Sequence, residues 1–230
     1  MLLQVDSLLN PEIQETGTVQ STRIIDIIAR MGPFGWIVMG LLFALLLMAV
    51  YILLERYFTI KKASKIDSNF MNKIRDHVTN GKLEAAKAIC EQTNSPVARM
   101  IHKGVLRIGR PLKDINAAIE NVGNLEVSKL EKNLPVLATI AGAAPMLGFL
   151  GTVTGMINAF YKLSVAGNNI DTSQLAGGIY EALFTTAFGL AVGILAYIGY
   201  NWLVSLLQKV IFQMEANSVD FIDLIQEPGR

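Results

Sequence analysis

The apolar residues of the chain gather into three stretches that are each long enough to cross a lipid bilayer. Residues 34–54 are rich in Leu and Ile and carry no charge, whereas 134–160 and 175–204 contain many glycines and hydroxyl side chains. About 20 apolar residues in a helix span the ~30 Å hydrocarbon core. The pattern therefore predicts an all-α membrane protein with three membrane-spanning helices, at 34–55, 134–161 and 175–204.

The segment between the first two spans, residues 56–133, shows apolar positions at helical spacing in four short stripes. Asn-Gly, Ser-Pro and Gly-Arg-Pro sequences separate these stripes, as expected for turns between helices. The fourth stripe reaches Leu130 and is expected to continue into the second span, with Pro135 near the junction. A similar stripe follows the third span, so residues 205–230 are expected to extend that helix beyond the membrane.

The remaining segments are the N-terminal tail, residues 1–33, and a short connection, residues 162–174. Within the tail, residues 18–31 have apolar residues on one helical face and charged residues on the others. This predicts a short amphipathic helix. Its apolar face is typical either of a helix that lies at the membrane surface or of an ordinary packing helix.

The distribution of charge predicts the orientation of the chain in the membrane. Residues 56–133 contain 15 Lys and Arg against 8 Asp and Glu, whereas residues 1–33 contain only 2 basic residues. Loops that remain in the cytoplasm carry an excess of Lys and Arg. The segment 56–133 and the C-terminus are therefore expected in the cytoplasm, with the N-terminus and the connection 162–174 in the periplasm.

Glu181 is the one acidic residue of the third span. A carboxylate in hydrocarbon costs about 2.5 kcal/mol or more, so such residues usually have a function or reach water. One interpretation makes Glu181 part of a proton pathway, because burial raises the pKa of a carboxyl group towards neutral pH. The alternative is that Glu181 lies near the outer end of the helix and extends to the lipid headgroups.

Hydroxyl groups and small residues distinguish the second and third spans from the first. Thr152, Thr185 and Thr186 are candidates for a polar pathway, although a membrane threonine often bonds only to the carbonyl four residues earlier. Thr185 shares a helical face with Glu181. Small residues allow helix backbones to approach closely. The candidates for such packing are Pro145, Gly148, Gly151, Gly155, Gly178, Gly189 and Gly193.

Sequence signatures of catalysis are missing: the chain has no HExxH, GxSxG or Walker A motif and no Cys/His cluster at metal-ligand spacing. We therefore expect neither an enzyme nor a bound cofactor or metal. Cys90 is expected in a helical core, and His77 and His102 are expected to be surface or packing residues. The basic segment is explained by topology, so no nucleic-acid binding is expected.

Two runs in the glycine-rich spans resemble the MotA/TolQ/ExbB proton-channel family, and in particular its ExbB branch. They are APMLGFLGTVTGMINAF at 144–160 and LAGGIYEALFTTAFGLAVGILAYIGYN at 175–201. The family pattern has a Pro followed by GxxGTVxG, and then GIxEALxTxxGL. The sequence departs from it at Ile194-Leu195-Ala196, where many relatives have a proline, and this puts a kink there in doubt.

The resemblance implies a homopentamer in the inner membrane of Gram-negative bacteria that surrounds the single membrane helices of two ExbD-like subunits. Together they would use the proton motive force to drive a TonB-like protein, which energises uptake across the outer membrane. The family's proton-carrying aspartate belongs to the partner helix. Positions that match Thr152, Glu181 and Thr186 line or flank the pore.

Two other functions remain open at this stage. The chain could be a TolQ-like motor subunit that acts in envelope integrity, gliding or secretion. It could also be a membrane scaffold whose glycine faces only pack helices and which conducts no protons.

Overall fold

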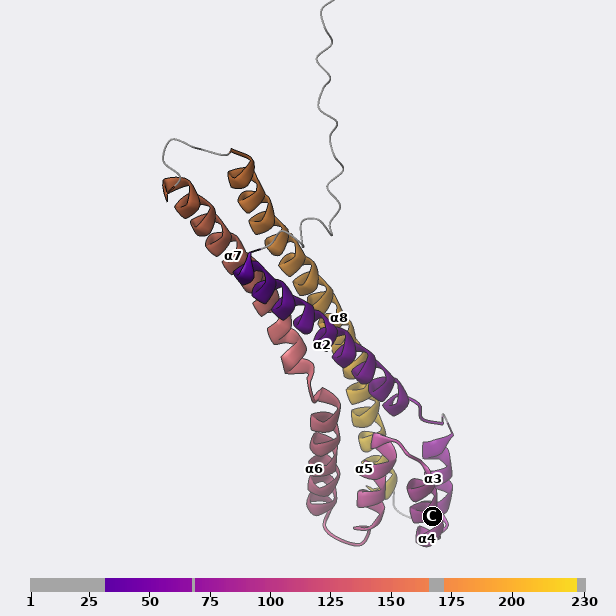
Figure 1. The fold of residues 1–230 in the computed structure, drawn as a ribbon. Coiled ribbons are helices and arrows are strands. Elements are labelled where there is room, and N and C mark those ends of the chain that lie inside the picture. The colour runs from indigo at the N-terminus through magenta and orange to yellow at the C-terminus, as the bar shows by residue number, and fades with distance from the viewer. Residues whose placement is uncertain (1–31, 68, 166–171, 227–230) are drawn as a thin grey trace, which may run out of the picture.

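The computed structural model describes residues 32–67, 69–165 and 172–226 of the 230-residue chain. The amphipathic helix expected at 18–31 lies outside these residues, as do residues 166–171 of the connection 162–174. Helices make up the regular structure of the described part (Figure 1). Their bounds are α2 (Pro33–Ala63), α3 (Phe70–Thr79), α4 (Leu83–Gln92), α5 (Pro96–Val105), α6 (Leu112–Glu131), α7 (Leu134–Val165) and α8 (Thr172–Gln226).

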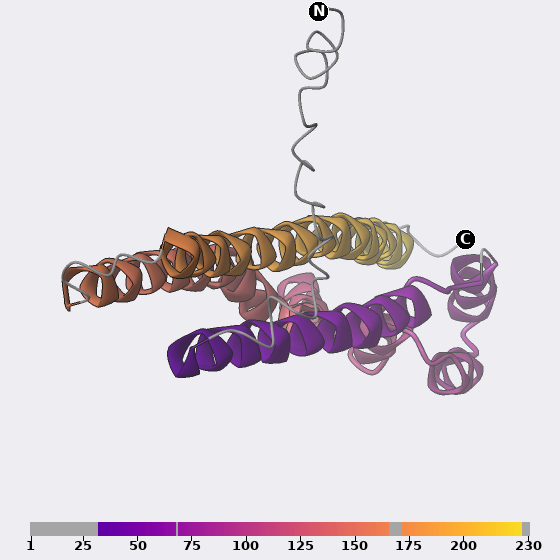
Figure 2. The same ribbon diagram turned by 45° about the horizontal axis from the view of Figure 1, so that its top comes forward.

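Three long helices, α2, α7 and the first part of α8, lie side by side along one elongated bundle (Figures 1 and 2). Each is long and apolar enough to cross a membrane. Their outer faces are apolar too: Ile37 is 67% exposed, Met146 73% and Ile198 63%. Such a surface is unusual for a water-soluble monomer and typical of a membrane or an intersubunit contact. The prediction of an all-helical protein with three candidate spans is confirmed.

The small helices α3 to α6 and the end of α8 form a helical domain at one end of the bundle (Figure 1). Its core contains Phe70, Ile74, Ile101, Ile119 and Phe221, each at most 2% exposed. Phe70, Ile74, Ile101 and Ile119 belong to the apolar stripes that helical spacing predicts in segment 56–133, and Phe221 comes from the end of α8. The third span continues into this domain without a break, because α8 is a single helix of 55 residues.

The junction between α6 and α7 differs from the sequence expectation of a continuous helix. α6 ends at Glu131, and α7 begins at Leu134 after a turn in which Asn133 has a φ of +66°. Pro135 favours a kink or a break at this point, since in a continuous helix its ring would clash with the Glu131 carbonyl four residues earlier. Near the start of a new helix, the missing N–H of Pro135 has no cost.

Candidate functional site

Small residues bring the backbones of α7 and α8 into direct contact. A Cβ atom added to Gly189 would lie 2.9 Å from the Cα of Gly148 and 2.7 Å from the Ala144 carbonyl. One added to Gly193 would lie 2.5 Å from Cγ of Pro145. Side chains at these positions would therefore force the helices apart.

The remaining glycines that the sequence singled out for packing lie along the same interface. A Cβ on Gly155 would meet Ala182, and one on Gly178 would meet Ala159. A Cβ on Gly151 would lie 2.6 Å from the Thr185 hydroxyl and 3.3 Å from Val38 of α2. All three membrane helices therefore meet at the level of Gly151.

The close approach of the backbones joins two hydroxyl groups, Thr152 of α7 and Thr186 of α8. Their Oγ1 atoms are hydrogen-bonded to each other. Thr186 also donates to the Gly148 carbonyl at 2.9 Å, and Thr152 lies within hydrogen-bonding distance of that carbonyl, at 3.2 Å, and of the Ala182 carbonyl, at 3.4 Å. The two threonines thus share one acceptor, the Gly148 carbonyl of α7, and Thr152 also reaches the Ala182 carbonyl of α8.

Each hydroxyl has one hydrogen, so these bonds cannot all form at once. In one arrangement, Thr186 donates to the Gly148 carbonyl and accepts from Thr152. In the other, Thr186 donates to Thr152, and the Thr152 hydroxyl donates to the carbonyl of Gly148 or Ala182. The cluster therefore has two directions of hydrogen bonding. It can orient water or a partner group, but a proton carrier that titrates in the physiological range must come from another residue.

Thr185 occupies a different environment from its neighbour Thr186. It is 1% exposed, and its hydroxyl donates to the Ala182 carbonyl at 2.7 Å. Its side chain packs against Gly151 inside the α7–α8 interface. The structure therefore places the Thr185 hydroxyl within the helix pair, where its acceptor, the Ala182 carbonyl, is also within reach of Thr152.

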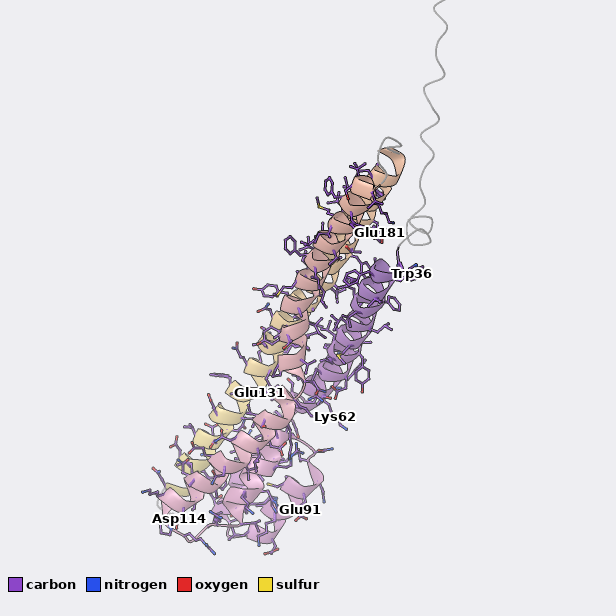
Figure 3. The ribbon with its side chains drawn as sticks, turned by 60° about the vertical axis from the view of Figure 1, so that its left-hand side comes forward. Trp36, Lys62, Glu91, Asp114, Glu131 and Glu181 are labelled. Atoms are coloured by element: carbon purple, nitrogen blue, oxygen red, sulfur yellow. The ribbon has the colours of Figure 1, made fainter. Side chains whose placement is uncertain are left out.

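Glu181 lies at the end of the bundle opposite to the helical domain, close to the start of α2, where Trp36 is also found (Figure 3). Its Oε1 atom accepts a hydrogen bond from the backbone N–H of Gly32 at 3.0 Å. Gly32 is the N-cap of α2, which has no side-chain cap and no acidic residue in its first turn. The carboxylate thus makes the bond to the N-cap N–H that a capping-box glutamate makes, but from another helix.

Two partners in this site could not be found from the sequence. Gly32 contributes a main-chain N–H and Ala182 a main-chain carbonyl. Every residue but proline has both groups, so no residue type marks such a position. Among the residues that the structure describes, no group of three or more His, Cys, Asp and Glu could hold a metal ion.

Most residues of this site lie in a region of the chain that matches one known protein family. Residues 92–216, which include α7 and the membrane part of α8, match the model of the MotA/TolQ/ExbB proton channel family. A biopolymer transport protein ExbB homolog of Methanothermobacter thermautotrophicus is 32% identical over 215 residues, covering 90% of this chain and 70% of that protein.

Two further relatives match over shorter regions. The Tol-Pal system protein TolQ of Haemophilus influenzae is 38% identical over 130 residues, which cover 56% of this chain and 52% of that protein. The biopolymer transport protein ExbB of Xanthomonas campestris is 32% identical over 117 residues, covering 50% of this chain and 46% of that protein. The matches thus span about half the length of these two relatives.

The extent of these matches decides the family. The family model covers more than half of the chain, and the relative from M. thermautotrophicus is similar along nearly all of it. Together with three apolar helices of sufficient length, this makes the chain a multi-pass membrane protein. We conclude that the chain belongs to the MotA/TolQ/ExbB proton channel family.

Proposed function

We propose that this chain is an ExbB-like subunit of a proton-driven motor in the inner membrane. Five copies would surround the membrane helices of two ExbD-like subunits, and the complex would use the proton motive force to do mechanical work on a TonB-like protein. Family membership supports this proposal, as do relatives that carry the ExbB name. The observation that carries it is the Thr152–Thr186 hydroxyl pair inside the region of the family match.

The proposed pathway uses the polar groups of α7 and α8 to serve a titratable group on the partner helix. Thr152 and Thr186 would orient water or the partner carboxyl group, since their hydroxyls can reverse their direction of donation. Glu181 would supply negative charge at the outer end of the pathway. Thr185, which the sequence places in the same pathway, would support the pair from within the helix interface.

The proposed orientation places the helical domain in the cytoplasm. This domain holds most of the Lys and Arg residues of segment 56–133, and such residues are favoured on the cytoplasmic side. Gly32 and Glu181 would then lie at the periplasmic side, together with the N-terminus. A cysteine-accessibility assay on intact cells tests this orientation at exposed positions such as Ser164 and Asn124.

A TolQ-like role in envelope integrity is the second candidate. The specific observation in its favour is the 38% identity to the TolQ protein of H. influenzae. Deletion of the gene separates the two functions, because loss of TonB-type energy coupling impairs growth under iron limitation. Loss of a Tol-type system instead causes detergent sensitivity with normal growth on scarce iron.

Native mass spectrometry of the gently extracted, tagged protein tests the proposal most directly. We expect a homopentamer that carries two copies of a single-span protein with an aspartate in its membrane helix. An oligomer that stays free of partners under mild extraction would contradict the motor function. It would favour a scaffold whose glycine faces only pack helices, and a scaffold would be unaffected when the proton gradient is dissipated.

A further inference from the structure

The break between α6 and α7 frees a main-chain carbonyl that another helix then binds. In a continuous helix, the Lys129 carbonyl would accept the N–H of Asn133, four residues later. Here Lys132 has a ψ of 135°, far from the helical value, so the peptide before Asn133 is turned away. The Lys129 carbonyl instead accepts a hydrogen bond from Nη1 of Arg56, at 3.0 Å.

Arg56 belongs to α2, and it is one of the few charged residues that are buried in the described part of the chain. It is 5% exposed. Its Nε atom donates to Oε2 of Glu55 at 2.6 Å, and its Nη2 atom is also paired with that carboxylate. A buried guanidinium is strongly unfavourable unless it is paired and hydrogen-bonded. The Glu55 carboxylate and the Lys129 carbonyl together meet that requirement.

Glu55 connects Arg56 to the turn itself. Asn133, the residue with positive φ, and Lys132 both lie close enough to the Glu55 carboxylate to stabilise its charge. Arg56 and Glu55 therefore contact both sides of the break: the last turn of α6 and the turn that leads into α7. Figure 3 shows Glu131, the last residue of α6, and Lys62, near the end of α2, on this part of the molecule.

A chain of ion pairs extends from this point into the helical domain. Lys129 binds Glu126 of α6 through its Nζ atom at 2.7 Å. Glu126 is 4% exposed, and its other oxygen accepts from Nη2 of Arg99 on α5 at 2.5 Å. The contacts therefore run from α2 through α6 to α5.

We propose that Arg56 is a positioning residue that fixes the direction in which α6 leaves α7. Its bond to Lys129 replaces the helical bond that the turn removes, and a positive charge is favourable at the C-terminal end of α6. We call this contact, formed by Glu55, Arg56, Lys129 and Asn133, the α6–α7 joint. On the basis of the proposed motor function, the joint transmits movement of α7 to the helical domain.

Electron paramagnetic resonance distances across the joint test the positioning role. Spin labels are placed on introduced cysteines at Asn121 of α6 and Thr139 of α7, both of which are exposed. Cys90, the only native cysteine, is replaced by alanine. The full chain is measured in lipid nanodiscs, diluted with unlabelled chain so that only distances within one chain contribute.

The variants are Arg56→Gln, Arg56→Lys and a matched control, Arg107→Gln. Arg107 also donates to a main-chain carbonyl, that of Asp114 at 3.1 Å, but at the opposite end of α6. We expect one narrow distance in the parent protein and in the control. Arg56→Gln should shift or broaden the distribution. Arg56→Lys should do so less, since one ammonium group cannot reproduce all bonds of the guanidinium.

A parent-like distribution in both Arg56 variants would overturn the positioning role. If Arg56→Gln does not insert or assemble, the Arg56→Lys variant decides on the same criterion. Because the readout is a distance within one chain, it does not depend on the motor function. A shifted distance combined with normal energised uptake would disprove transmission through the joint, whatever the result for Thr152 and Thr186.

Discussion

Glu181 of α8 accepts a hydrogen bond from the backbone N–H of Gly32 across 149 positions of the sequence. The bond joins the last membrane helix to the start of the first one. A carboxylate at this point also interacts favourably with the N-terminal dipole of α2. The single acidic side chain of the third span therefore has a structural partner, and any role in a proton pathway must coexist with this bond.

Replacing Glu181 by Gln separates its two possible roles. Gln retains an oxygen that can accept from Gly32 but carries no charge and takes up no proton. We expect Glu181→Gln to lose energised uptake but only about 0.3–1 kcal/mol of stability, the contribution of its charge to the helix dipole. Glu181→Ala should lose uptake and also about 1–3 kcal/mol of stability, the usual effect of removing a charged hydrogen-bond partner. Normal uptake by the Gln variant would assign Glu181 to helix positioning alone.

Thr186 and Thr185 form a matched pair for testing the hydroxyl cluster. Val has nearly the shape of Thr, so Thr186→Val removes the bonds to Thr152 and the Gly148 carbonyl with little change in packing. We expect an assembled protein that fails to energise uptake. Thr185→Val removes a hydroxyl that is bonded only to the Ala182 carbonyl, and its uptake should stay close to normal.

The outcome for Thr185 decides between two placements of that residue. The sequence puts it on the Glu181 face and so in the pathway, whereas its contacts place it inside the helix pair. Uptake assays with protein levels checked by immunoblotting distinguish the two. A Thr185→Val protein that is present at a normal level but inactive would show that the Thr185 hydroxyl takes part in the proton pathway.

Much of the fold could be predicted from the sequence, because it follows from apolar periodicity. The three spans, the helical stripes of segment 56–133 and the continuation of the third span into a long helix all depend on local spacing. The α6–α7 break could not be placed, since Pro135 is compatible both with a kinked continuous helix and with the first turn of a new one. Asn133 decides the matter by adopting positive φ, which Asn tolerates better than most residues.

The composition of the candidate site was predictable, but its pairing was not. Threonines and a carboxylate stand out against an apolar background, so Thr152, Glu181 and Thr186 could be named in advance. Their partners depend on the relative rotation and height of packed helices, which residue spacing within one helix does not determine. Arg56 illustrates the same limit: an arginine after an apolar run is usually exposed, and here a main-chain carbonyl keeps it buried.

Close packing of α7 and α8 can be tested with two glycines of the same helix. A Cβ on Gly148 would lie 2.9 Å from the Thr185 carbonyl and 3.1 Å from Cα of Gly189, whereas one on Gly142 would meet nothing within 4 Å. We expect Gly148→Ala to cost about 1–3 kcal/mol of stability, the usual effect of overpacking. Gly142→Ala should be neutral or stabilising by up to about 1 kcal/mol, because Ala favours helix.

Thermal unfolding in detergent, followed by circular dichroism, gives the comparison between these two variants. The Gly142→Ala protein controls for the change in helix propensity, which is the same at both positions. Equal melting temperatures would show that the α7–α8 contact can widen at Gly148 without loss. That result would also weaken the Thr152–Thr186 pair, since both hydroxyls lie within hydrogen-bonding distance of the Gly148 carbonyl.

The Cys90 thiol reports on the integrity of the helical domain. It is 3% exposed, and burial raises its pKa from the ordinary value of 9.0 to about 12. Thiolate is the reactive form, and at pH 8 this shift lowers its fraction about a thousandfold. We expect a maleimide or disulfide reagent to leave the folded protein unlabelled at pH 8 and to label it rapidly in denaturant.

The same shift predicts how the stability of the helical domain changes in alkaline solution. Between pH 9 and pH 12 the thiol of the unfolded chain loses its proton, whereas the buried thiol keeps it. The unfolded state then binds fewer protons than the folded state, so the free energy of unfolding falls as pH rises through this window. A Cys90→Ala variant removes this contribution and should lose less stability than the parent protein between pH 8 and pH 10.5. Denaturant titrations at the two pH values measure the difference, and parallel losses in both proteins would show that Cys90 ionises as readily in the folded chain as in the unfolded one.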